Sequence, residues 1–480
     1  MRITFLVPPC YDHKQPAERS AGCTRVVYPM PNIYELTLAA ALRDLGGNEV
    51  EYEDFAFFGR TAEDFARFAA SHDTDLYIIW AVNLSIDSDL QAIREIRKTH
   101  RETPVVMVGP GPTYYSAKCV VDPNCYVVRG EPELTCLELV KALEDHTPLD
   151  GIKGLTYMEN GKLKANPPRP LNTDLDSLPF PARDLVADHV YHNPKLKTGP
   201  YMTMFTSRNC PYQCIYCVPS SLSFAREIEF GKEHEGRKPT IGFRSVESVA
   251  REIDALAAEG VKAIGFMDDN FIWNEERTRA ICEPLRRHGI VWGCEARVDA
   301  ITEPIAKLLG ESGCRYIDLG VESFNADILK YIKKGITPDD IVRATRLLKK
   351  YNVPVKLNIL IGSSPLETKE TVKETLRMAK KLDVDQVMFN IVSPFPGTKY
   401  YTVCKENGWI KGGEYKPTDV QRESILNLPH ITAREMERML FKNNLSFFVR
   451  PSFIWKHLKR FTSLSEFKAS FKALKIKLFG

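Results

Sequence analysis

The stretch that decides the fold reads Ser207-Arg-Asn-Cys210-Pro-Tyr-Gln-Cys214-Ile-Tyr-Cys217 and directly follows a β-rich run at 201–206. In a chain with 12 cysteines, three cysteines at this spacing are expected by chance only about 0.01 times. Thiolates are soft, anionic ligands, and such close spacing lets one loop wrap around a metal cluster. Three protein thiolates leave one iron of a 4Fe-4S cluster open, and an open coordination position is what metal catalysis requires. The stretch therefore predicts a catalytic cluster.

The pattern CxxxCxxC, with the aromatic Tyr216 before its last cysteine, resembles the signature of the radical S-adenosylmethionine (radical SAM) superfamily. The resemblance implies that Cys210, Cys214 and Cys217 hold a 4Fe-4S cluster whose open iron chelates the amino and carboxylate groups of S-adenosylmethionine. One electron then cleaves the sulfonium to a deoxyadenosyl radical that abstracts hydrogen from the substrate. A structural zinc knot is the alternative, but zinc sites favour paired CxxC knuckles and the sequence has no second pair.

Composition places the chain among soluble globular proteins. Its 480 residues are 44% hydrophobic and 26% charged, which suggests two to four domains. The net charge of +3 argues against a dedicated nucleic-acid binder. The nine other cysteines fall singly in apolar segments, as free thiols do in a reducing cytosol. No apolar run reaches the roughly 18 residues of a membrane span, and the N-terminal run is too short for a signal peptide, so we expect a cytoplasmic protein.

The first 150 residues alternate between short apolar runs and segments with helical spacing. Such alternation with short connections is typical of a doubly wound α/β domain, which binds ligands at the carboxyl ends of its strands. We expect strands at 2–7, 49–53, 75–81, 104–108 and 126–128, and helices that include 32–45, 88–99 and 134–143.

This half resembles the cobalamin-binding domain that precedes many radical SAM modules. The resemblance rests on the prolines after the first strand, on Val108-Gly-Pro-Gly-Pro-Thr113 and on Val128-Arg-Gly-Glu-Pro-Glu133. The DxHxxG motif of other cobalamin proteins is absent, since His13 follows Asp12 directly, and loss of the cofactor with retention of the fold is the alternative. The small glycines would let a corrin or its nucleotide tail approach the backbone closely. The cobalamin contacts that the resemblance implies are Gly109, Gly111, Thr113 and Glu131.

A proline-rich connector at 166–170 and 178–181 separates the two halves. We expect a cobalamin-binding-like domain at 1–150, a linker at 151–195, a radical SAM barrel at 196–410 and a C-terminal extension at 411–480. Six strand–helix units predict a partial (β/α)₆ barrel of the TIM type, with its active site at the carboxyl ends of the strands. The strands are expected at 201–206, 262–267, 290–295, 315–321, 354–361 and 386–392, and the helices at 245–259, 275–288, 302–312, 338–351 and 368–382.

Polar residues follow the second, third and fourth of these strands. In radical SAM relatives the matching loops line the S-adenosylmethionine site, which needs acidic partners for an ammonium and a basic fork for a carboxylate. The turn at 362–365 departs from the glycine-proline-glycine turn that is usual in the fifth loop. The charged segment 220–241 is expected to be a solvated excursion, with a lid over the site as the alternative. By this resemblance, Asp268 and Asp269 would lie near the amino group of S-adenosylmethionine, and Glu295 and Arg297 would meet its ribose or carboxylate. The full set of implied contacts is Tyr216, Asp268, Asp269, Glu295, Arg297, Glu322 and Ser323.

The tail from Arg450 carries eight Lys or Arg residues against one acid, Glu466, and these alternate with aromatic and aliphatic residues. An aromatic, basic amphipathic segment of this kind adsorbs to anionic lipid headgroups. A helix docked on its own barrel is the alternative, and RNA binding is a third, weaker interpretation because no RNA-binding domain accompanies the tail.

Together these features predict a cobalamin-dependent radical SAM enzyme that transfers a methyl group to an unactivated carbon of a small, apolar substrate: a lipid, a terpenoid or a tetrapyrrole. A reduced flavodoxin or ferredoxin-type protein is the expected electron donor. A cyclase or ring-rearranging enzyme of the same family is the first alternative, and a non-catalytic iron–sulfur or cobalamin sensor is the second. A tRNA methylthiotransferase is disfavoured, because the N-terminal cysteines do not form the further trio of that group.

Overall fold

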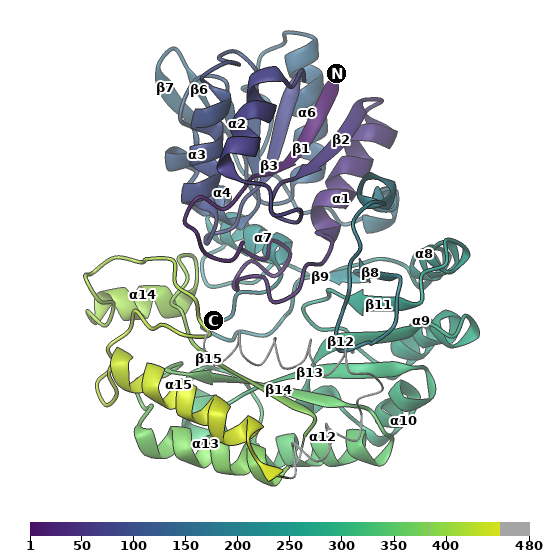
Figure 1. The fold of residues 1–480 in the computed structure, drawn as a ribbon, viewed down its shortest axis with the longest axis vertical. Helices are drawn as coiled ribbons and strands as arrows, with labels where there is room; N and C mark the ends of the chain where they lie inside the picture. Colours follow the sequence, from purple (N-terminus) through teal and green to yellow (C-terminus); the bar gives the residue numbers. More distant parts are fainter. Residues whose placement is uncertain (383, 452–480) are drawn as a thin grey trace. The chain divides into compact units, whose positions relative to one another are not determined.

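The computed structural model describes residues 1–382 and 384–451 (Figure 1). The chain divides into two compact units. The first unit comprises Met1–Pro211 and Val218–Cys294, and the second comprises Tyr212–Cys217 and the chain from Glu295 onward. The division falls inside the stretch that carries the three predicted cluster ligands.

The N-terminal part of the first unit is a seven-stranded sheet with the order β2-β1-β3-β4-β5-β6-β7. Its first five strands pair in parallel, and β1 lies between β2 and β3: Phe5 lies opposite Tyr52 on one side and Ile78 on the other. All five expected strands are present. They are β1 (Arg2–Val7), β2 (Glu49–Asp54), β3 (Leu76–Trp80), β4 (Val105–Val108) and β5 (Cys125–Val128).

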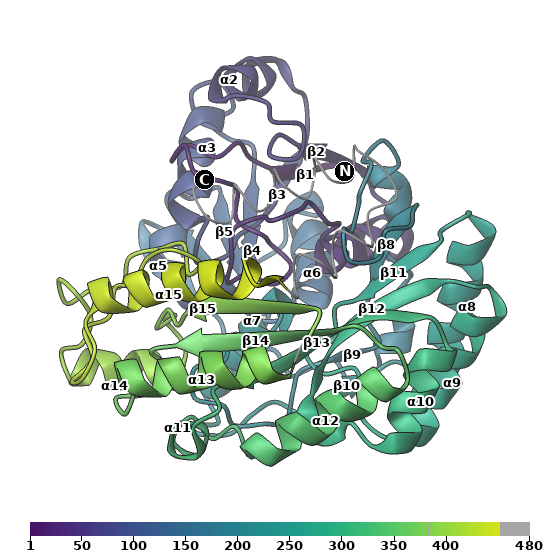
Figure 2. The ribbon, with the colours of Figure 1, turned by 60° about the horizontal axis from the view of Figure 1, so that its bottom comes forward.

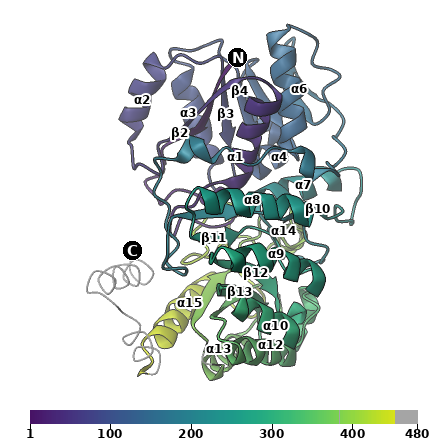
Figure 3. The same ribbon diagram turned by 90° about the vertical axis from the view of Figure 1, so that its right-hand side faces the viewer.

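Helices cover both faces of this sheet, as Figure 3 shows for α2 and α3 on one side and α6 on the other. The expected doubly wound domain is therefore confirmed. Its helices are α1 (Ile33–Ala40), which continues through the π-helical turn η1 (Ala41–Leu45), α2 (Ala62–Ser71), α3 (Ile86–Ile96), α4 (Pro110–Tyr114), α5 (Ser116–Cys119) and α6 (Pro132–Glu144).

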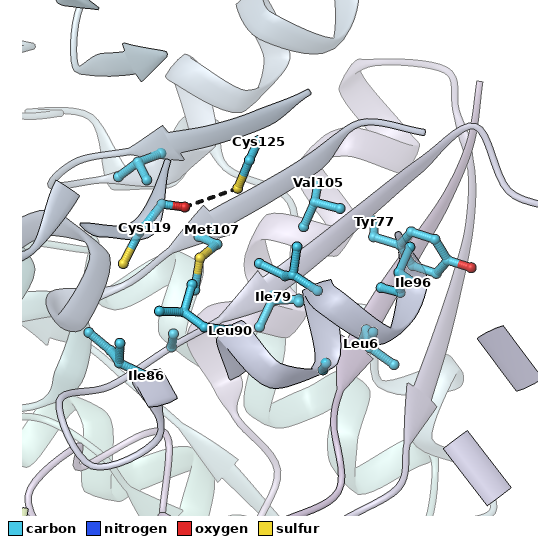
Figure 4. Packing of buried hydrophobic residues seen from close by; sticks show 14 of the residues in the cluster. Leu6, Tyr77, Ile79, Ile86, Leu90, Ile96, Val105, Met107, Cys119 and Cys125 are labelled. Carbon is cyan, nitrogen blue, oxygen red and sulfur yellow. Dashed lines mark hydrogen bonds between the residues drawn. The ribbon is translucent and has the colours of Figure 1, made fainter. Parts of the chain in front are cut away.

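One core cluster lies between the sheet and helices α2 and α3 (Figure 4). Helix α3 contributes Leu90 and Ile93, and the strands contribute Leu6, Ile79 and Met107, none more than 3% exposed. Burying each of these side chains contributes about 1.5–3 kcal/mol. This apolar face is what fixes α3 against the strands, because its buried residues recur at helical spacing.

The strand order places β1 between β2 and β3, so the chain reverses its direction of progress across the sheet at β1. In doubly wound sheets, ligands bind at this switch point, outside the carboxyl ends of the strands. The segments that follow β4 and β5 carry the predicted cobalamin contacts Gly109, Gly111, Thr113 and Glu131.

A hairpin that the sequence analysis did not predict extends the sheet into the expected linker. Strands β6 (Leu155–Glu159) and β7 (Lys162–Ala165) are antiparallel, and β6 pairs with β5. The turn residues Asn160 and Gly161 both have positive φ, at 51° and 73°. Such a two-residue turn matches the twist of a hairpin and favours Asn-Gly.

The second sheet has the order β15-β14-β13-β12-β11-β8 and runs parallel, in agreement with the expected partial barrel. Helices alternate with its strands. The strands are β8 (Tyr201–Met204), β11 (Ala263–Phe266), β12 (Val291–Arg297), β13 (Cys314–Glu322), β14 (Val355–Ile361) and β15 (Gln386–Ile391), and the helices are α8 (Val246–Ala258), α9 (Glu275–Arg287), α10 (Glu303–Glu311), α11 (Ala326–Tyr331), α12 (Pro338–Lys350) and α13 (Lys369–Lys381). A two-stranded ribbon of β9 (Ser207–Arg208) and β10 (Gly242–Phe243) lies in the first unit.

The prediction that segment 220–241 is a solvated excursion was wrong for its first half, whereas residues 231–241 are mostly exposed or half-buried. Most of its first half is helix α7 (Ser221–Gly231), which packs against α4 within the first unit. Leu222, Phe224 and Ala225 are at most 2% exposed. The charged residues of this helix misled the sequence analysis, because two of them, Arg226 and Glu229, are themselves buried in ion pairs.

In the second unit, helix α15 (Ala433–Phe448) follows α14 (Lys399–Glu406) and packs on β15, with α13 beside it (Figure 2). The Phe389 and Phe447 rings lie 6.4 Å apart at this contact. No helix among the described residues is long and apolar enough to cross a membrane. The basic, aromatic tail lies outside the described residues from 452 onward.

Candidate active site

The cluster-binding loop, defined here as residues 210–217, contains three half-buried cysteines that form no disulfide. Cys210 belongs to the first unit, and Cys214 and Cys217 belong to the second, where the Cys217 amide donates to the Cys214 carbonyl at 3.3 Å. Among the described residues, no group of three or more His, Cys, Asp or Glu side chains is arranged to hold a single metal ion. Three partly accessible thiols are the donor set that an iron–sulfur cluster takes, whereas most other cysteines of the chain are fully buried.

The four residues before Cys210 are held by acidic side chains of the first unit. Asp268, directly after β11, accepts the Thr206 amide at 3.0 Å and the Thr206 and Ser207 hydroxyls at 2.7 and 2.6 Å. Asp269 accepts the Asn209 amide at 3.0 Å through one oxygen and the Ser220 amide at 2.6 Å through the other. Both carboxylates were predicted to lie near the amino group of S-adenosylmethionine. In the structure, Asp268 contacts the chain before the cluster-binding loop, and Asp269 contacts the chain on both sides of it.

Burial changes the acidity of Asp268. The side chain is 2% exposed, and this burial raises its pKa to about 6, although the hydrogen bonds from Ser207 and Thr206 act in the opposite direction. Asp268 is thus a buried hydrogen-bond acceptor that holds the Thr206 amide and the Thr206 and Ser207 hydroxyls in place.

Arg208 is also buried, and it connects the approach to the cluster-binding loop with the loop between β5 and α6. Its guanidinium donates to Glu131 at 2.9 Å and to Glu133 at 2.6 Å, and all three side chains are nearly inaccessible. Arg226 of α7 lies 3.2 Å from the same Glu131 oxygen. We call Arg208, Arg226, Glu131 and Glu133 the buried ionic network. Burial lowers the pKa of Arg208, but the two carboxylates more than offset this and raise it above its ordinary value.

The predicted cobalamin contacts are all in the first unit, but their side-chain space is taken by the protein itself. A Cβ atom on Gly109 would lie 2.6 Å from the Ala81 carbonyl, and one on Gly111 would lie 2.8 Å from Ile86. These glycines therefore allow α4 to pack closely against the segment after β3. Thr113 is fully buried and bonds the Gly109 carbonyl at 2.7 Å and the Gly130 amide at 3.1 Å. These four residues shape the carboxyl end of the sheet, and a cofactor there would meet their backbone.

A second anchor, Arg129, joins several elements of the first unit. Its guanidinium donates to Glu229 of α7 at 2.9 Å, to the Leu155 carbonyl of β6 at 2.8 Å, and to the Asn166 carbonyl at the start of the connector. The Arg129 and Glu229 side chains are 3% and 5% exposed. This cation ties the carboxyl end of β5 to the hairpin and to α7.

In the second unit, Tyr216 of the cluster-binding loop meets a buried ion pair. Lys334 donates to Glu322 at 2.8 Å and to the Tyr216 hydroxyl at 3.3 Å. Both partners of the ion pair are under 9% exposed. Burial opposes the charge on Lys334, but the Glu322 carboxylate outweighs it and raises the Lys334 pKa. Lys334 was missed by the sequence analysis, since it lies in the connection between helices α11 and α12 with no motif around it.

Arg297, at the end of β12, also holds the cluster-binding loop. Its guanidinium forms a two-pronged pair with Asp299, with both bonds at 2.9 Å, and donates to the Lys334 carbonyl at 2.8 Å. The same guanidinium lies 3.5 Å from the centre of the Tyr212 ring, a close cation–π contact. The Arg297 guanidinium, which was expected to meet the carboxylate of S-adenosylmethionine, is thus paired with the Asp299 carboxylate of the same chain.

The remaining two predicted contacts differ from each other. Glu295 is exposed and lies on β12 two residues before Arg297. Ser323 is buried, accepts the Asn325 amide at 3.1 Å and lies 3.4 Å from Thr375 of helix α13, so its hydroxyl caps a turn. Of the predicted residues in the second unit, the structure brings Tyr216 together with Glu322, and it places the Ser323 hydroxyl toward α13.

Comparison with known proteins agrees with this two-part organisation. The B12 binding domain model matches residues 19–140, and the Radical SAM superfamily model matches residues 204–379. An uncharacterized methyltransferase of Pyrococcus horikoshii is 33% identical over 465 residues, which cover 95% of each chain. The anaerobic magnesium-protoporphyrin IX monomethyl ester cyclase of Synechocystis is 24% identical over 86% of this chain and 79% of its own.

Among solved structures, the radical S-adenosylmethionine methyltransferase TsrM from Kitasatospora setae matches with a TM-score of 0.65 and 21% identity, over 85% of this chain and 75% of its own. The cobalamin-dependent S-adenosylmethionine radical enzyme OxsB matches with a TM-score of 0.71 and 17% identity, over 100% of this chain and 71% of its own. At these identities the likeness concerns the fold. The sequence match along nearly the whole chain, the two domain models and the shared fold together show that the chain belongs to the cobalamin-binding radical SAM enzymes, whose cofactors are a 4Fe-4S cluster, S-adenosylmethionine and cobalamin.

Proposed function

We propose that this enzyme transfers a methyl group to an unactivated carbon atom. The observation that carries the proposal is the 33% identity, over 95% of both chains, to a relative named as a methyltransferase. Because the alignment covers nearly the whole of both chains, a common reaction type is the simplest inference.

The chain's own residues would prepare the site for this chemistry. When bound, the cluster and cobalamin would supply one-electron cleavage of S-adenosylmethionine and carriage of the methyl group. Cys210, Cys214 and Cys217 would hold the cluster. Glu295, which is exposed on β12, would meet the ribose of S-adenosylmethionine, and the paired Glu322 and Lys334 hold the Tyr216 hydroxyl in place.

We further propose an apolar substrate, with a tetrapyrrole as the first candidate and a lipid or terpenoid as the others. Two observations support this class. The relatives include enzymes named for magnesium-protoporphyrin IX monomethyl ester and for bacteriochlorophyllide d. The composition of the tail from Arg450, basic and aromatic, also suits contact with an anionic membrane where apolar substrates dissolve. If a protein truncated after residue 451 bound anionic vesicles as well as the full chain, the tail would lend no support.

Anaerobic reconstitution tests the proposal. Protein purified with iron, sulfide and hydroxocobalamin should show corrinoid absorption, and with S-adenosylmethionine and a reductant it should release both S-adenosylhomocysteine and deoxyadenosine. With a tetrapyrrole methyl acceptor, the product should gain one methylene unit, labelled when the methyl group of S-adenosylmethionine is deuterated. The Cys217→Ala variant serves as the matched control, in which deoxyadenosine release should stop. Deoxyadenosine without S-adenosylhomocysteine, from protein that contains corrinoid, would contradict methyl transfer.

A cyclase is the second candidate, because the Synechocystis cyclase aligns over 86% of this chain. The mass of the product separates the two reactions, since ring closure adds no methyl group. A reduced flavodoxin or ferredoxin-type protein is the proposed source of the electron in either case.

A further inference from the structure

The chain on the two sides of the cluster-binding loop is fixed to a single side chain of the first unit. Asp269 accepts the Asn209 amide at 3.0 Å and, through its other oxygen, the Ser220 amide at 2.6 Å. Asn209 precedes the first cluster cysteine, and Ser220 follows the last one by three residues. One carboxylate therefore holds both ends of the segment that carries all three ligands.

The surroundings of Asp269 show that this arrangement is built into the fold. Asn209 is fully buried with φ at 73°, a left-handed conformation that costs free energy unless its contacts compensate. Its amide is shared between Asp269 and the Ser223 hydroxyl of α7, at 3.0 Å each. Asp269 itself follows β11, whose parallel pairing with β8 fixes its position. The carboxylate and both amides are thus placed by different elements of the same unit.

We propose that Asp269 is a positioning residue for the cluster: it clamps the two ends of the cluster-binding loop, so that the thiolates are presented at a fixed spacing before the cluster binds. Bonds from amides to a carboxylate are charge-assisted and are about twice as strong as neutral ones. A loop with both ends fixed loses less conformational freedom when it closes around a cluster. The proposal replaces the expected role of Asp269 as a contact for the amino group of S-adenosylmethionine. It does not depend on which group the enzyme transfers.

The chain offers substitutions that separate the two ends of the clamp. Asp269→Asn keeps the size of the side chain but turns one oxygen into an NH₂ group that faces an amide donor. Ser220→Pro removes the Ser220 N–H together with its hydroxyl, and the φ of −49° at this position is compatible with proline. Ser220→Ala keeps the N–H and is the matched baseline for the proline variant. Asp254→Asn changes an exposed carboxylate of α8 in the same unit and is the control for Asp269→Asn.

The test measures how fast reconstituted protein loses its cluster to an iron chelator under anaerobic conditions, together with the electron paramagnetic resonance spectrum of the reduced cluster. We expect Asp269→Asn and Ser220→Pro to lose the cluster at least about 10-fold faster than wild type, as the loss of one charge-assisted bond predicts, and to show broadened spectra. Ser220→Ala and Asp254→Asn should match wild type, and Asp269→Glu should recover part of the retention.

Wild-type rates and spectra in both Asp269→Asn and Ser220→Pro would overturn the proposal. Fast loss in Asp269→Asn with no difference between Ser220→Pro and Ser220→Ala would overturn the two-ended clamp and would instead favour a direct contact of Asp269 with a cofactor. Thermal unfolding of the cluster-free proteins shows which variants fold, and if Asp269→Asn does not fold, the Ser220 pair decides alone.

Discussion

Replacing Arg208 by methionine removes the cation at the centre of the buried ionic network while keeping an unbranched apolar side chain. In the wild type, Arg208 is 1% exposed and donates to Glu131 and Glu133. Glu131 keeps two neighbours in the variant, Arg226 at 3.2 Å and the Asn172 amide at 2.7 Å. Glu133, which is 1% exposed, loses the guanidinium that it accepts from.

The expected cost follows from leaving a buried carboxylate without its cation. Removal of one partner from a buried ion pair typically costs about 3–5 kcal/mol of the free energy of unfolding. The double variant Arg208→Met with Glu133→Gln removes the uncompensated charge as well. It should therefore recover part of the loss, with a coupling energy of about 2 kcal/mol in the double-mutant cycle.

Urea unfolding of the cofactor-free proteins measures these differences, and hydrogen exchange over residues 125–144 shows whether the loss lies between β5 and α6. The control is Arg286→Met, which removes an exposed arginine of α9 that pairs with Glu283 and should change stability by no more than about 0.5 kcal/mol. The reasoning is refuted if Arg208→Met costs less than about 1 kcal/mol or if the two single substitutions are simply additive.

Three further predictions concern the second unit. Cys214→Ala should abolish cluster binding, and full iron content with unchanged S-adenosylmethionine cleavage would contradict its assignment as a ligand. Lys334→Met should weaken S-adenosylmethionine binding about 10-fold in a spectroscopic titration, because Glu322 and the Tyr216 hydroxyl lose their shared donor, whereas Lys350→Met at an exposed ion pair should not. Burial raises the pKa of Glu367 from 4.5 to about 7. Between these two pH values the folded protein keeps a proton that the unfolded chain has released. The free energy of unfolding therefore falls as the pH rises from about 4.5 to about 7. The fall attributable to Glu367 is about 3 kcal/mol, and it should be absent from Glu367→Gln when urea unfolding is compared at pH 5 and pH 8; equal pH profiles would refute it.

The sequence predicted the strands and most helices of both sheets, because their apolar residues recur with clear periods and end at glycine or proline. The hairpin of β6 and β7 was not predicted, because β7 is exposed along its length and has no apolar pattern. The Asn160-Gly161 pair was the signal that could have identified it. Helix α7 was not predicted, because its charged residues indicate an exposed segment, and the sequence does not show that Arg226 and Glu229 have buried ion-pair partners.

The candidate site was predictable in composition but not in contacts. The positions of Asp268 and Asp269 at a strand end were evident, yet only the structure shows that their acceptors are filled by backbone amides. The glycines at 109 and 111 were expected to let a corrin approach the backbone, and the structure shows that the Ala81 carbonyl and Ile86 of the same chain lie close to them. Such pairings depend on tertiary proximity, which a single sequence does not encode locally.

The Arg129 anchor has a consequence for how this architecture can be cut and recombined. Arg129 follows the last parallel strand, and its guanidinium donates to carbonyls of the hairpin and of the start of the connector. It also donates to Glu229 of α7, a hundred residues further along the chain. A fragment that stops near residue 150 would leave the Arg129 guanidinium without any of these hydrogen-bond acceptors. A chimera that takes this domain from a relative should therefore fold only if the crossover lies beyond Asn166 and α7 comes from the same relative. The N-terminal domain and α7 thus have to be exchanged together.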